Sequence, residues 1–98
     1  MFREGRRLEA RHVQVLAAPA AGAAGRVGYV IGKHQLGRAV DRNYLRRILR
    51  ETVRRRRPVL CQFDIVVRLR IRCARSVLPG LALEAAGLLD ALVAAKHR

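Results

Sequence analysis

Arginines recur at every fourth position in the middle of this sequence. Arg42, Arg46, Arg50 and Arg54 are each separated by four residues, and Asn43 lies directly beside the first of them. On an α-helix, residues four apart share one face and rise about 6 Å per step. A guanidinium group can hold two phosphate oxygens through paired hydrogen bonds. The spacing therefore predicts a helix that presents a row of phosphate-binding side chains, with Asn43 available for sugar or base edges.

This helix is expected over residues 38–57, and its two sides differ in chemistry. Winding the sequence at about 100° per residue separates an apolar half, which would pack on a sheet, from a basic arc about 140° wide. Val53 falls within the basic arc, whereas Arg55 and Arg56 fall within the apolar half. The apolar half holds Val40, Tyr44, Leu45, Ile48, Leu49 and Thr52, and the basic arc holds Arg42, Asn43, Arg46, Arg47, Arg50 and Arg54.

A solvated helix face without a ligand is the alternative interpretation of the basic arc. Such faces usually mix signs, with acids placed three or four residues from bases. Here Asp41 suits the N-cap or first turn of the helix, and Glu51 is the only acid between it and the helix end. Because surfaces of a single sign are usually avoided unless they attract a ligand, we favour a polyanionic partner.

The charge of the whole chain supports that choice. Its 98 residues contain 21 Lys and Arg but 7 Asp and Glu, a formal net charge of +14. A genome biased toward arginine codons would explain the preference for Arg over Lys, but it would not explain the shortage of acids. Nucleic acid is the first candidate partner and an anionic membrane surface the second.

Neither a membrane protein nor an enzyme with its own catalytic residues is indicated. The most apolar long window, residues 77–95, contains Pro79, two glycines and two acids, and is expected to be a soluble helix. Cysteine and histidine spacing fits no zinc site, and no nucleophile–base pair or phosphate-binding glycine loop is present. Asp41 and Asp64 could each hold a hydrated magnesium ion, although a helix cap and an arginine partner are the simpler roles. Two reduced thiols, Cys61 and Cys73, fit a cytoplasmic protein.

The remaining elements follow from hydrophobic periodicity, and together they predict a single α+β domain spanning residues 1–98. The segment 62–72 alternates with an apolar face and a mostly basic face, which is typical of a strand covered on one side. The predicted fold is a two-layer α/β sandwich with a small sheet. Its expected elements are strands at 10–16, 26–33 and 62–72, a hairpin loop at 17–25, and helices at 38–57 and 80–97.

The stretch from Gly32 to Glu51 resembles the signature of the bacterial ribonuclease P protein. In that family an Ala-Val pair, an Arg-Asn pair and further basic residues follow a strand at fixed spacing. The resemblance extends in outline over nearly the whole chain, including Phe2 and Gly5, residues 26–28 and residues 63–67. The matching signature positions are Lys33, Ala39, Val40, Arg42, Asn43, Arg46, Arg47, Arg50 and Glu51.

The resemblance implies an RNA-binding subunit that assists a catalytic RNA in removing the 5′ leader from precursor tRNA. In this ribonucleoprotein endonuclease the RNA and its Mg²⁺ carry out hydrolysis, and the protein contributes no catalytic residue, no metal ligand and no obligate protein partner. The implied fold has a mixed sheet and a left-handed β-α-β crossover, as in the second domain of a small-subunit ribosomal protein. Most of the family's first helix, which precedes the position of Phe2, is expected to be missing here.

The resemblance also implies two groups of contact residues. The helix and its preceding loop would face the catalytic RNA, whereas a cleft beside the sheet would hold the single-stranded leader, with bases stacked on apolar groups. Roles as ordinary core or surface residues remain open for Gln14 and Leu16. The RNA-facing residues would be Lys33, His34, Arg38, Arg42, Asn43, Arg46, Arg47 and Arg50, and the leader cleft would contain Phe2, His12, Gln14 and Leu16.

A ribosomal or other structural RNA-binding protein could use the same basic helix. Composition does not distinguish the two hypotheses, and the Arg42-Asn43 signature in its strand context is the feature that favours ribonuclease P.

Overall fold

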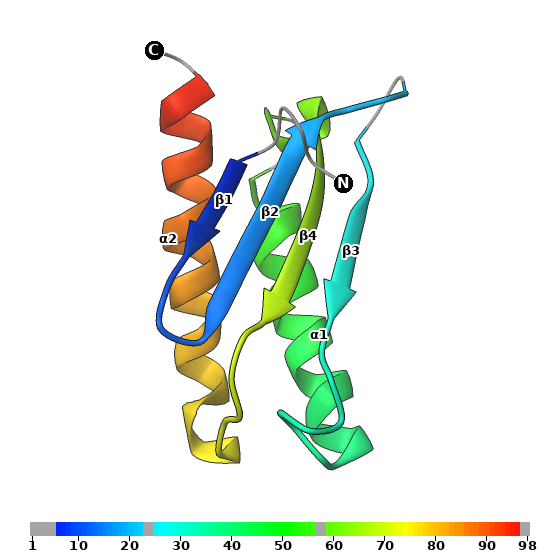
Figure 1. Cartoon of the computed structure of the whole chain (residues 1–98), viewed down its shortest axis with the longest axis vertical. Coiled ribbons are helices and arrows are strands. Elements are labelled where there is room, and N and C mark those ends of the chain that lie inside the picture. The colour runs from blue at the N-terminus through cyan, green and yellow to red at the C-terminus, as the bar shows by residue number, and fades with distance from the viewer. Residues whose placement is uncertain (1–5, 23–24, 57–58, 97–98) are drawn as a thin grey trace.

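The computed structural model describes residues 6–22, 25–56 and 59–96, which form one four-stranded sheet with two helices packed on a single face (Figure 1). The predicted α+β two-layer architecture is confirmed. The strands are β1 (Arg6–Glu9), β2 (Val13–Pro19), β3 (Val27–Val30) and β4 (Phe63–Leu69), and the helices are α1 (Ala39–Arg54) and α2 (Leu78–Lys96). Short 3₁₀ turns, Val59–Gln62 and Arg75–Val77, precede β4 and α2.

The sheet has the order β1-β2-β4-β3 and is mixed, as predicted. β2 pairs antiparallel with β1 and β4, whereas β3 pairs parallel with β4. In Figure 1 the arrowheads of β3 and β4 point down, α1 lies behind the sheet, and β4 lies to the left of β3. The β3-α1-β4 crossover is therefore left-handed, the hand expected from the family resemblance and opposite to the general preference.

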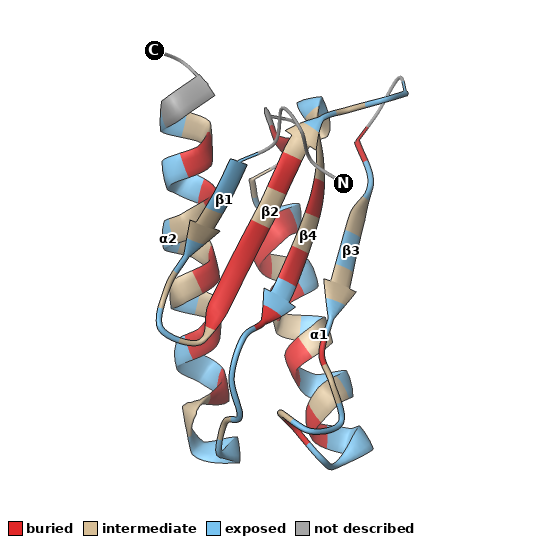
Figure 2. Cartoon of the chain, in the orientation of Figure 1, coloured by how far each residue is buried: buried red, intermediate tan, exposed pale blue. Residues whose placement is uncertain are grey.

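Alternation along β2 and β4 builds the core. Val15 and Val67 are register partners on the two central strands, and both are fully buried. Figure 2 shows buried residues along both strands. Leu45 of α1 and Leu89 of α2 cover them from the helix layer and are equally inaccessible. Side chains at the intervening strand positions point to the opposite face, which no element among the described residues covers. The sheet thus has one apolar face and one open face.

Several element boundaries differ from the sequence-based expectation. β1 was not predicted, because Leu8 is its one apolar residue facing the core and its other side chains are charged. β2 continues to Pro19, through small residues that were assigned to a hairpin loop at 17–25. At the other end of the chain, β4 stops at Leu69 rather than near residue 72. Edge strands and alanine-rich strands carry weak alternation signals, which explains the first two differences.

α1 buries a different arc of its surface from the one that winding the sequence predicted. Val53, assigned to the basic arc, is 3% exposed, whereas Val40 and Tyr44, assigned to the apolar half, are 55% and 37% exposed. Winding considers the helix alone, but in the fold the start of α1 extends past the area covered by the sheet. Val40 and Tyr44 there face a hollow between α1 and the start of α2.

Helix α2, with the turn before it, is long and apolar enough by length and composition to cross a membrane. Its inner side nevertheless packs in the core, because Leu81, Leu89 and Leu92 are buried. The core helix of a soluble protein passes the same length and composition test, so this finding alone does not indicate a membrane span.

Gly25 occupies a position without room for a side chain. Its N–H donates to the carbonyl of Cys61 at 2.7 Å, and a Cβ there would lie 1.7 Å from the carbonyl oxygen of Phe63. We expect Gly25→Ala to lower the free energy of unfolding by about 1–3 kcal/mol, as overpacking typically does. Gly22→Ala is the matched control, because a Cβ at that position would have no other atom within 4 Å. Equal melting temperatures for the two variants would contradict this close approach.

Candidate nucleic-acid interface

The loop that precedes α1 is held to the helix by one arginine. The N–H groups of Gln35 and Leu36 donate to the carbonyl of Gly32, and the buried Leu36 side chain anchors the loop in the core. Arg42 then donates from Nη1 to the carbonyl oxygens of Leu36 at 3.0 Å and Gly37 at 2.8 Å. Arg42, which is half-buried, therefore fixes the loop against α1.

This clamp leaves three other predicted RNA-facing residues exposed. Lys33 and His34 lie in the turn after β3, and Arg38 lies at the N-cap position of α1 with an extended backbone. Asp41 occupies the first turn of the helix, one of the two positions predicted for it, and is buried there in an ion pair with Arg75. The loop and the helix start thus place three cationic or titratable side chains next to the signature residues on α1.

The outward side of α1 brings together the middle of the signature. Arg46 donates from Nη1 to Oδ1 of Asn43 at 3.1 Å, and Arg47 and Arg50 are exposed. The guanidinium carbon of Arg47 lies 5.7 Å from the centroid of the Tyr44 ring, within the range of a cation–π contact. These residues all line one hollow, and Arg50 also lines a second, smaller hollow between α1 and β3. Arg50 is therefore positioned between two concave surfaces.

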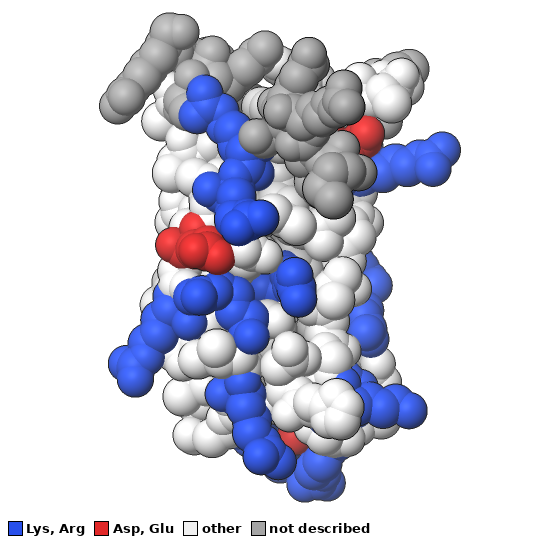
Figure 3. Space-filling model, viewed as in Figure 1, with Lys and Arg blue, Asp and Glu red and all other residues white. Residues whose placement is uncertain are grey.

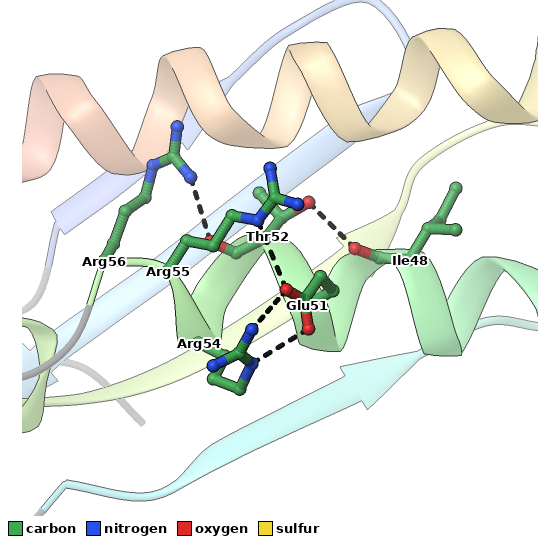
Figure 4. Close-up of polar contacts among 6 residues, drawn as sticks. All are labelled: Ile48, Glu51, Thr52, Arg54, Arg55 and Arg56. Atoms are coloured by element: carbon green, nitrogen blue, oxygen red, sulfur yellow. Dashed lines mark hydrogen bonds and ion pairs between the residues drawn. The ribbon is translucent and has the colours of Figure 1, made fainter.

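The last turn of α1 carries a local ion-pair cluster instead of a continued arginine row (Figure 4). Glu51 accepts a hydrogen bond from Nε of Arg54 at 2.9 Å and another from Nε of Arg55 at 3.2 Å. These hydrogen bonds lower the pKa of Glu51 to about 2 and raise that of Arg54. Arg56 turns toward α2 and binds Asp90. The charge of Arg54 is thus partly neutralised by Glu51, and Arg50 is the last exposed arginine of the row before this cluster.

The Glu51 cluster predicts an unusual acid titration. Because the pKa in the folded chain lies below the ordinary 4.5, the carboxylate's contribution to stability is complete above that value and is lost as pH falls toward about 2. We expect the carboxyl ¹³C resonance of Glu51 to titrate near pH 2, and near its ordinary value when Arg54 and Arg55 are both alanine. A wild-type midpoint at the ordinary value would show that the two ion pairs do not persist in solution.

The residues expected in the leader cleft do not all lie on one surface. Gln14 and Leu16 point to the open face of the sheet, where Gln14 is 7% exposed and donates to Oε2 of Glu9 at 2.6 Å. In the register of the sheet they lie beside Arg68 and Arg7, which point to the same face. Figure 3 shows this side of the molecule, with Lys and Arg side chains spread over it and few acids. Phe2 lies outside the described residues.

His12 is bonded to α2. The backbone N–H of His12 donates to Oε1 of Glu84 at 2.8 Å, and Nδ1 of its ring lies 2.5 Å from Oε2 of the same carboxylate. Burial raises the pKa of Glu84, but the hydrogen bonds from His12 outweigh it and leave the pKa below its ordinary value. His12 therefore ties the β1–β2 turn to the helix layer, in contrast to Gln14 and Leu16 on the open face.

Within the part of the chain that the structure describes, no group of three or more His, Cys, Asp or Glu side chains could hold a metal ion. Asp64, which the sequence offered as a possible magnesium ligand or arginine partner, accepts hydrogen bonds from the backbone N–H groups of Arg26 and Ala21. These bonds lower its pKa, and they close the loop between β2 and β3.

Sequence reasoning missed two residues that line the larger hollow. Tyr44 was assigned to the buried half of α1, and Arg75 was not assigned to any site. The position of Tyr44 depends on how far α1 extends beyond the sheet, which periodicity does not report. Arg75 reaches the site through a long-range contact with Asp41, a pairing for which the sequence carries no local signal.

Comparison with known proteins identifies the family. The family model described as Ribonuclease P matches residues 1–92. The chain belongs to the ribonuclease P protein family. Among curated relatives, the ribonuclease P protein component of Burkholderia mallei is 42% identical over 57 residues, which is 58% of this chain and 42% of that protein. The corresponding protein of Idiomarina loihiensis is 43% identical over 56 residues, 57% of this chain and 45% of that protein. The chain thus matches less than half the length of these relatives.

Solved structures agree on the fold of this ribonuclease P family member. The RNase P protein from Thermotoga maritima superposes with a TM-score of 0.66 at 28% identity, covering 93% of this chain and 83% of that one. The RNase P protein of Staphylococcus aureus gives a TM-score of 0.67 at 22% identity, covering 96% of this chain and 83% of that one, and supports the fold alone. The four-stranded mixed sheet with two helices packed on it therefore matches known RNase P protein structures.

Proposed function

We propose that this chain is the RNA-binding subunit of a cytoplasmic ribonuclease P and assists its catalytic RNA in removing the 5′ leader from precursor tRNA. The observation that carries the proposal is the outward side of α1, where Arg46, Arg47 and Arg50 stand together on the family's signature helix. Family membership and a net charge of +14 point to the same kind of partner. A polyanion that releases bound counterions on contact would gain much of its affinity from such a surface.

The RNA-facing surface in this proposal comprises the loop before α1 and the outer side of the helix. Lys33, His34 and Arg38 extend the charged surface from the helix into the loop that Arg42 clamps. Because Arg42 holds the backbone of the loop, less backbone conformational entropy is lost when RNA binds these residues. The full contact set is Lys33, His34, Arg38, Arg42, Asn43, Arg46, Arg47 and Arg50.

The open face of the sheet is the proposed leader-binding surface. Leu16 offers an apolar contact for bases, and Arg7 and Arg68 on the same face offer charge for a single strand. Gln14 contributes less, because it is buried and bonded to Glu9. His12, held by Glu84, would act here by fixing the β1–β2 turn, and Phe2 would complete the cleft from the N-terminal segment.

Hydrolysis in this proposal belongs to the RNA and the Mg²⁺ ions bound to it. The chain's own residues bind and orient: the arginines neutralise phosphates of the folded RNA, and the open sheet face holds the substrate strand. Neutralising closely packed RNA phosphates reduces their mutual repulsion, so the protein should matter most where little Mg²⁺ is present to do the same.

Reconstitution tests the proposal. The chain is mixed with a bacterial ribonuclease P RNA, and precursor-tRNA cleavage is measured at low and high Mg²⁺, with the Thermotoga maritima protein as a positive control. We expect stimulation at low Mg²⁺ that diminishes as Mg²⁺ is raised. Failure to stimulate while the control protein succeeds would refute the proposal.

A ribosomal or other structural RNA-binding role remains the second candidate, because the same arginine surface would serve it. Competition separates the two. Bound ribonuclease P RNA should resist displacement by an equal mass of ribosomal RNA, whereas preferential binding of ribosomal RNA would favour the alternative.

A further inference from the structure

A hollow of about 1060 Å³ lies where the first half of α1 faces the connection from β4 into α2. Its apolar lining includes Val40, Tyr44 and Pro79, and the first two are 55% and 37% exposed. Val40 and Tyr44 therefore add apolar surface to a hollow whose remaining lining is largely charged. The cationic lining comprises Arg46, Arg47, Arg50 and Arg75.

The hollow contains a ready platform for a flat ring. Tyr44 is 37% exposed, and the guanidinium of Arg47 lies over its ring at 5.7 Å from the centroid. Aromatic rings and guanidinium planes both stack on nucleobases, and this stacking is tolerant of sequence. The Tyr44–Arg47 pair can therefore receive a base while the charge of Arg47 remains near the attached phosphate.

The opposite wall supplies a fixed cation. Nε of Arg75 lies 3.4 Å from Oδ1 of Asp41, whose side chain is 7% exposed, while that of Arg75 is 70% exposed. The buried carboxylate thus holds one edge of the guanidinium and leaves the remainder accessible to solvent. Among the described residues that line the hollow, Asp41 is the only acid against four arginines. Charge complementarity therefore favours an anionic occupant.

We propose that this hollow binds one unpaired nucleotide of an RNA, with the base stacked on Tyr44 and Arg47 and the flanking phosphates bound by Arg50 and Arg75. The inference rests on the proposed function and extends it in two ways. It adds an aromatic base contact to a surface otherwise built for phosphates. It also adds Arg75, which lies outside the signature helix, so that RNA would contact the chain on both sides of the hollow.

Substitution of Tyr44 tests the base contact. The probe is a fluorescent single-stranded oligoadenylate of about ten nucleotides, within the length range that single-strand sites accommodate. We expect Tyr44→Ala to weaken binding about 5- to 150-fold, the range for loss of one stacked base, without changing the slope of log affinity against log salt. Tyr44→Phe should bind as wild type, and Tyr44→Leu, which keeps apolar area without an aromatic face, should resemble Tyr44→Ala.

An oligomer of the same length in which every base is absent provides the decisive control. It should bind wild type and Tyr44→Ala equally, because it has phosphates but nothing to stack. Wild-type affinity of Tyr44→Ala for oligoadenylate would overturn the inference, and so would an equal loss on the abasic oligomer. Thermal melting of each variant establishes that the fold is retained.

Substitution of Arg75 tests the proposed phosphate contact on the opposite wall of the hollow. We expect Arg75→Ala to reduce the salt slope on oligoadenylate by about 0.7, the value for one phosphate contact on a single strand. Arg72→Ala is the matched control, because it removes the same charge from the same connection at an exposed position that does not line the hollow. Equal slopes for the two variants would overturn the role of Arg75. Arg75→Ala could unfold because it leaves Asp41 unpaired. In that case the salt slope of the double variant Asp41→Asn/Arg75→Ala is compared with that of Asp41→Asn alone.

Parallel titrations with a bacterial ribonuclease P RNA separate this inference from the proposed function. If alanine at Arg46 and Arg50 weakens that binding while the Tyr44 and Arg75 variants bind both probes as wild type, the inference fails and the proposed function stands. If ribonuclease P RNA is not bound at all, the proposed function fails, and the oligoadenylate comparisons still decide whether the hollow receives a nucleotide.

Discussion

Replacing Arg46 and Arg50 together with alanine is expected to weaken binding to ribonuclease P RNA about 30-fold near 0.15 M salt. Each lost phosphate contact removes about 0.9 from the slope of log affinity against log salt, which corresponds to about fivefold at that salt concentration. The double variant should therefore show a slope shallower by up to about 1.8. Affinities measured by filter binding over a series of salt concentrations give both quantities.

Two controls separate loss of contact from loss of charge or fold. Lysine at both positions keeps the charge, so the slope should be retained even though paired hydrogen bonds are lost. Arg55→Ala removes one charge from the C-terminal end of α1, where Arg55 is paired with Glu51. It should change the affinity less than Arg50→Ala alone. Unchanged affinity of the double alanine variant at every salt concentration would mean that RNA binds elsewhere.

Leu45→Ala is expected to lower the free energy of unfolding by about 2–5 kcal/mol, the usual cost of truncating a buried leucine. Leu45 is completely inaccessible at the centre of the interface between α1 and the rest of the core. For a domain of this size the loss corresponds to a fall in melting temperature of about 10 °C or more. Thermal unfolding followed by circular dichroism measures it.

Val40→Ala on the same helix is the matched control, and it also tests the orientation of α1. Sequence winding places Val40 in the packed half, but in the structure it is 55% exposed. We therefore expect its replacement to change stability by no more than about 0.5 kcal/mol, as surface substitutions usually do. A loss as large as that of Leu45→Ala would show that α1 is oriented as the winding suggested and that Tyr44 is buried.

The sequence predicted the elements with strong periodicity. The alternation of Phe63, Ile65, Val67 and Leu69 identified β4, and the arginine spacing identified α1, because a sheet covered on one side and an amphipathic helix each impose a repeat. β1 has no such repeat, since it is a charged strand at the edge of the sheet. The left hand of the crossover came from the family resemblance, because general physical preference favours the other hand.

The site was predicted less completely than the fold. Spacing alone showed that the four arginines of the row share a helix face, but it did not distinguish their roles. In the structure Arg42 clamps the loop and Arg54 is paired with Glu51, which leaves Arg46 and Arg50 as the most available members of the row. Such differences depend on backbone carbonyls and neighbouring acids that only the folded chain brings within hydrogen-bond distance.

The proposed leader-binding surface was also predicted incompletely, because part of it depends on contacts between residues distant in sequence. The family resemblance implied that His12, Gln14 and Leu16 line one cleft, but His12 lies in the turn before β2 and outside the strand that carries the other two. Its bond to Glu84, distant in sequence, is a tertiary contact that connects the sheet to α2. Gln14 and Leu16, within the strand, do share the open face.

Photocrosslinking tests most directly which surface of the chain faces the RNA. A benzophenone amino acid is introduced at position 40, which is exposed and uncharged beside the signature arginines, or at position 83, which is 77% exposed on α2. Each protein is irradiated in complex with a bacterial ribonuclease P RNA. Efficient crosslinks from position 40 and few from position 83 are expected. The reverse pattern would contradict an RNA interface on the arginine side of α1.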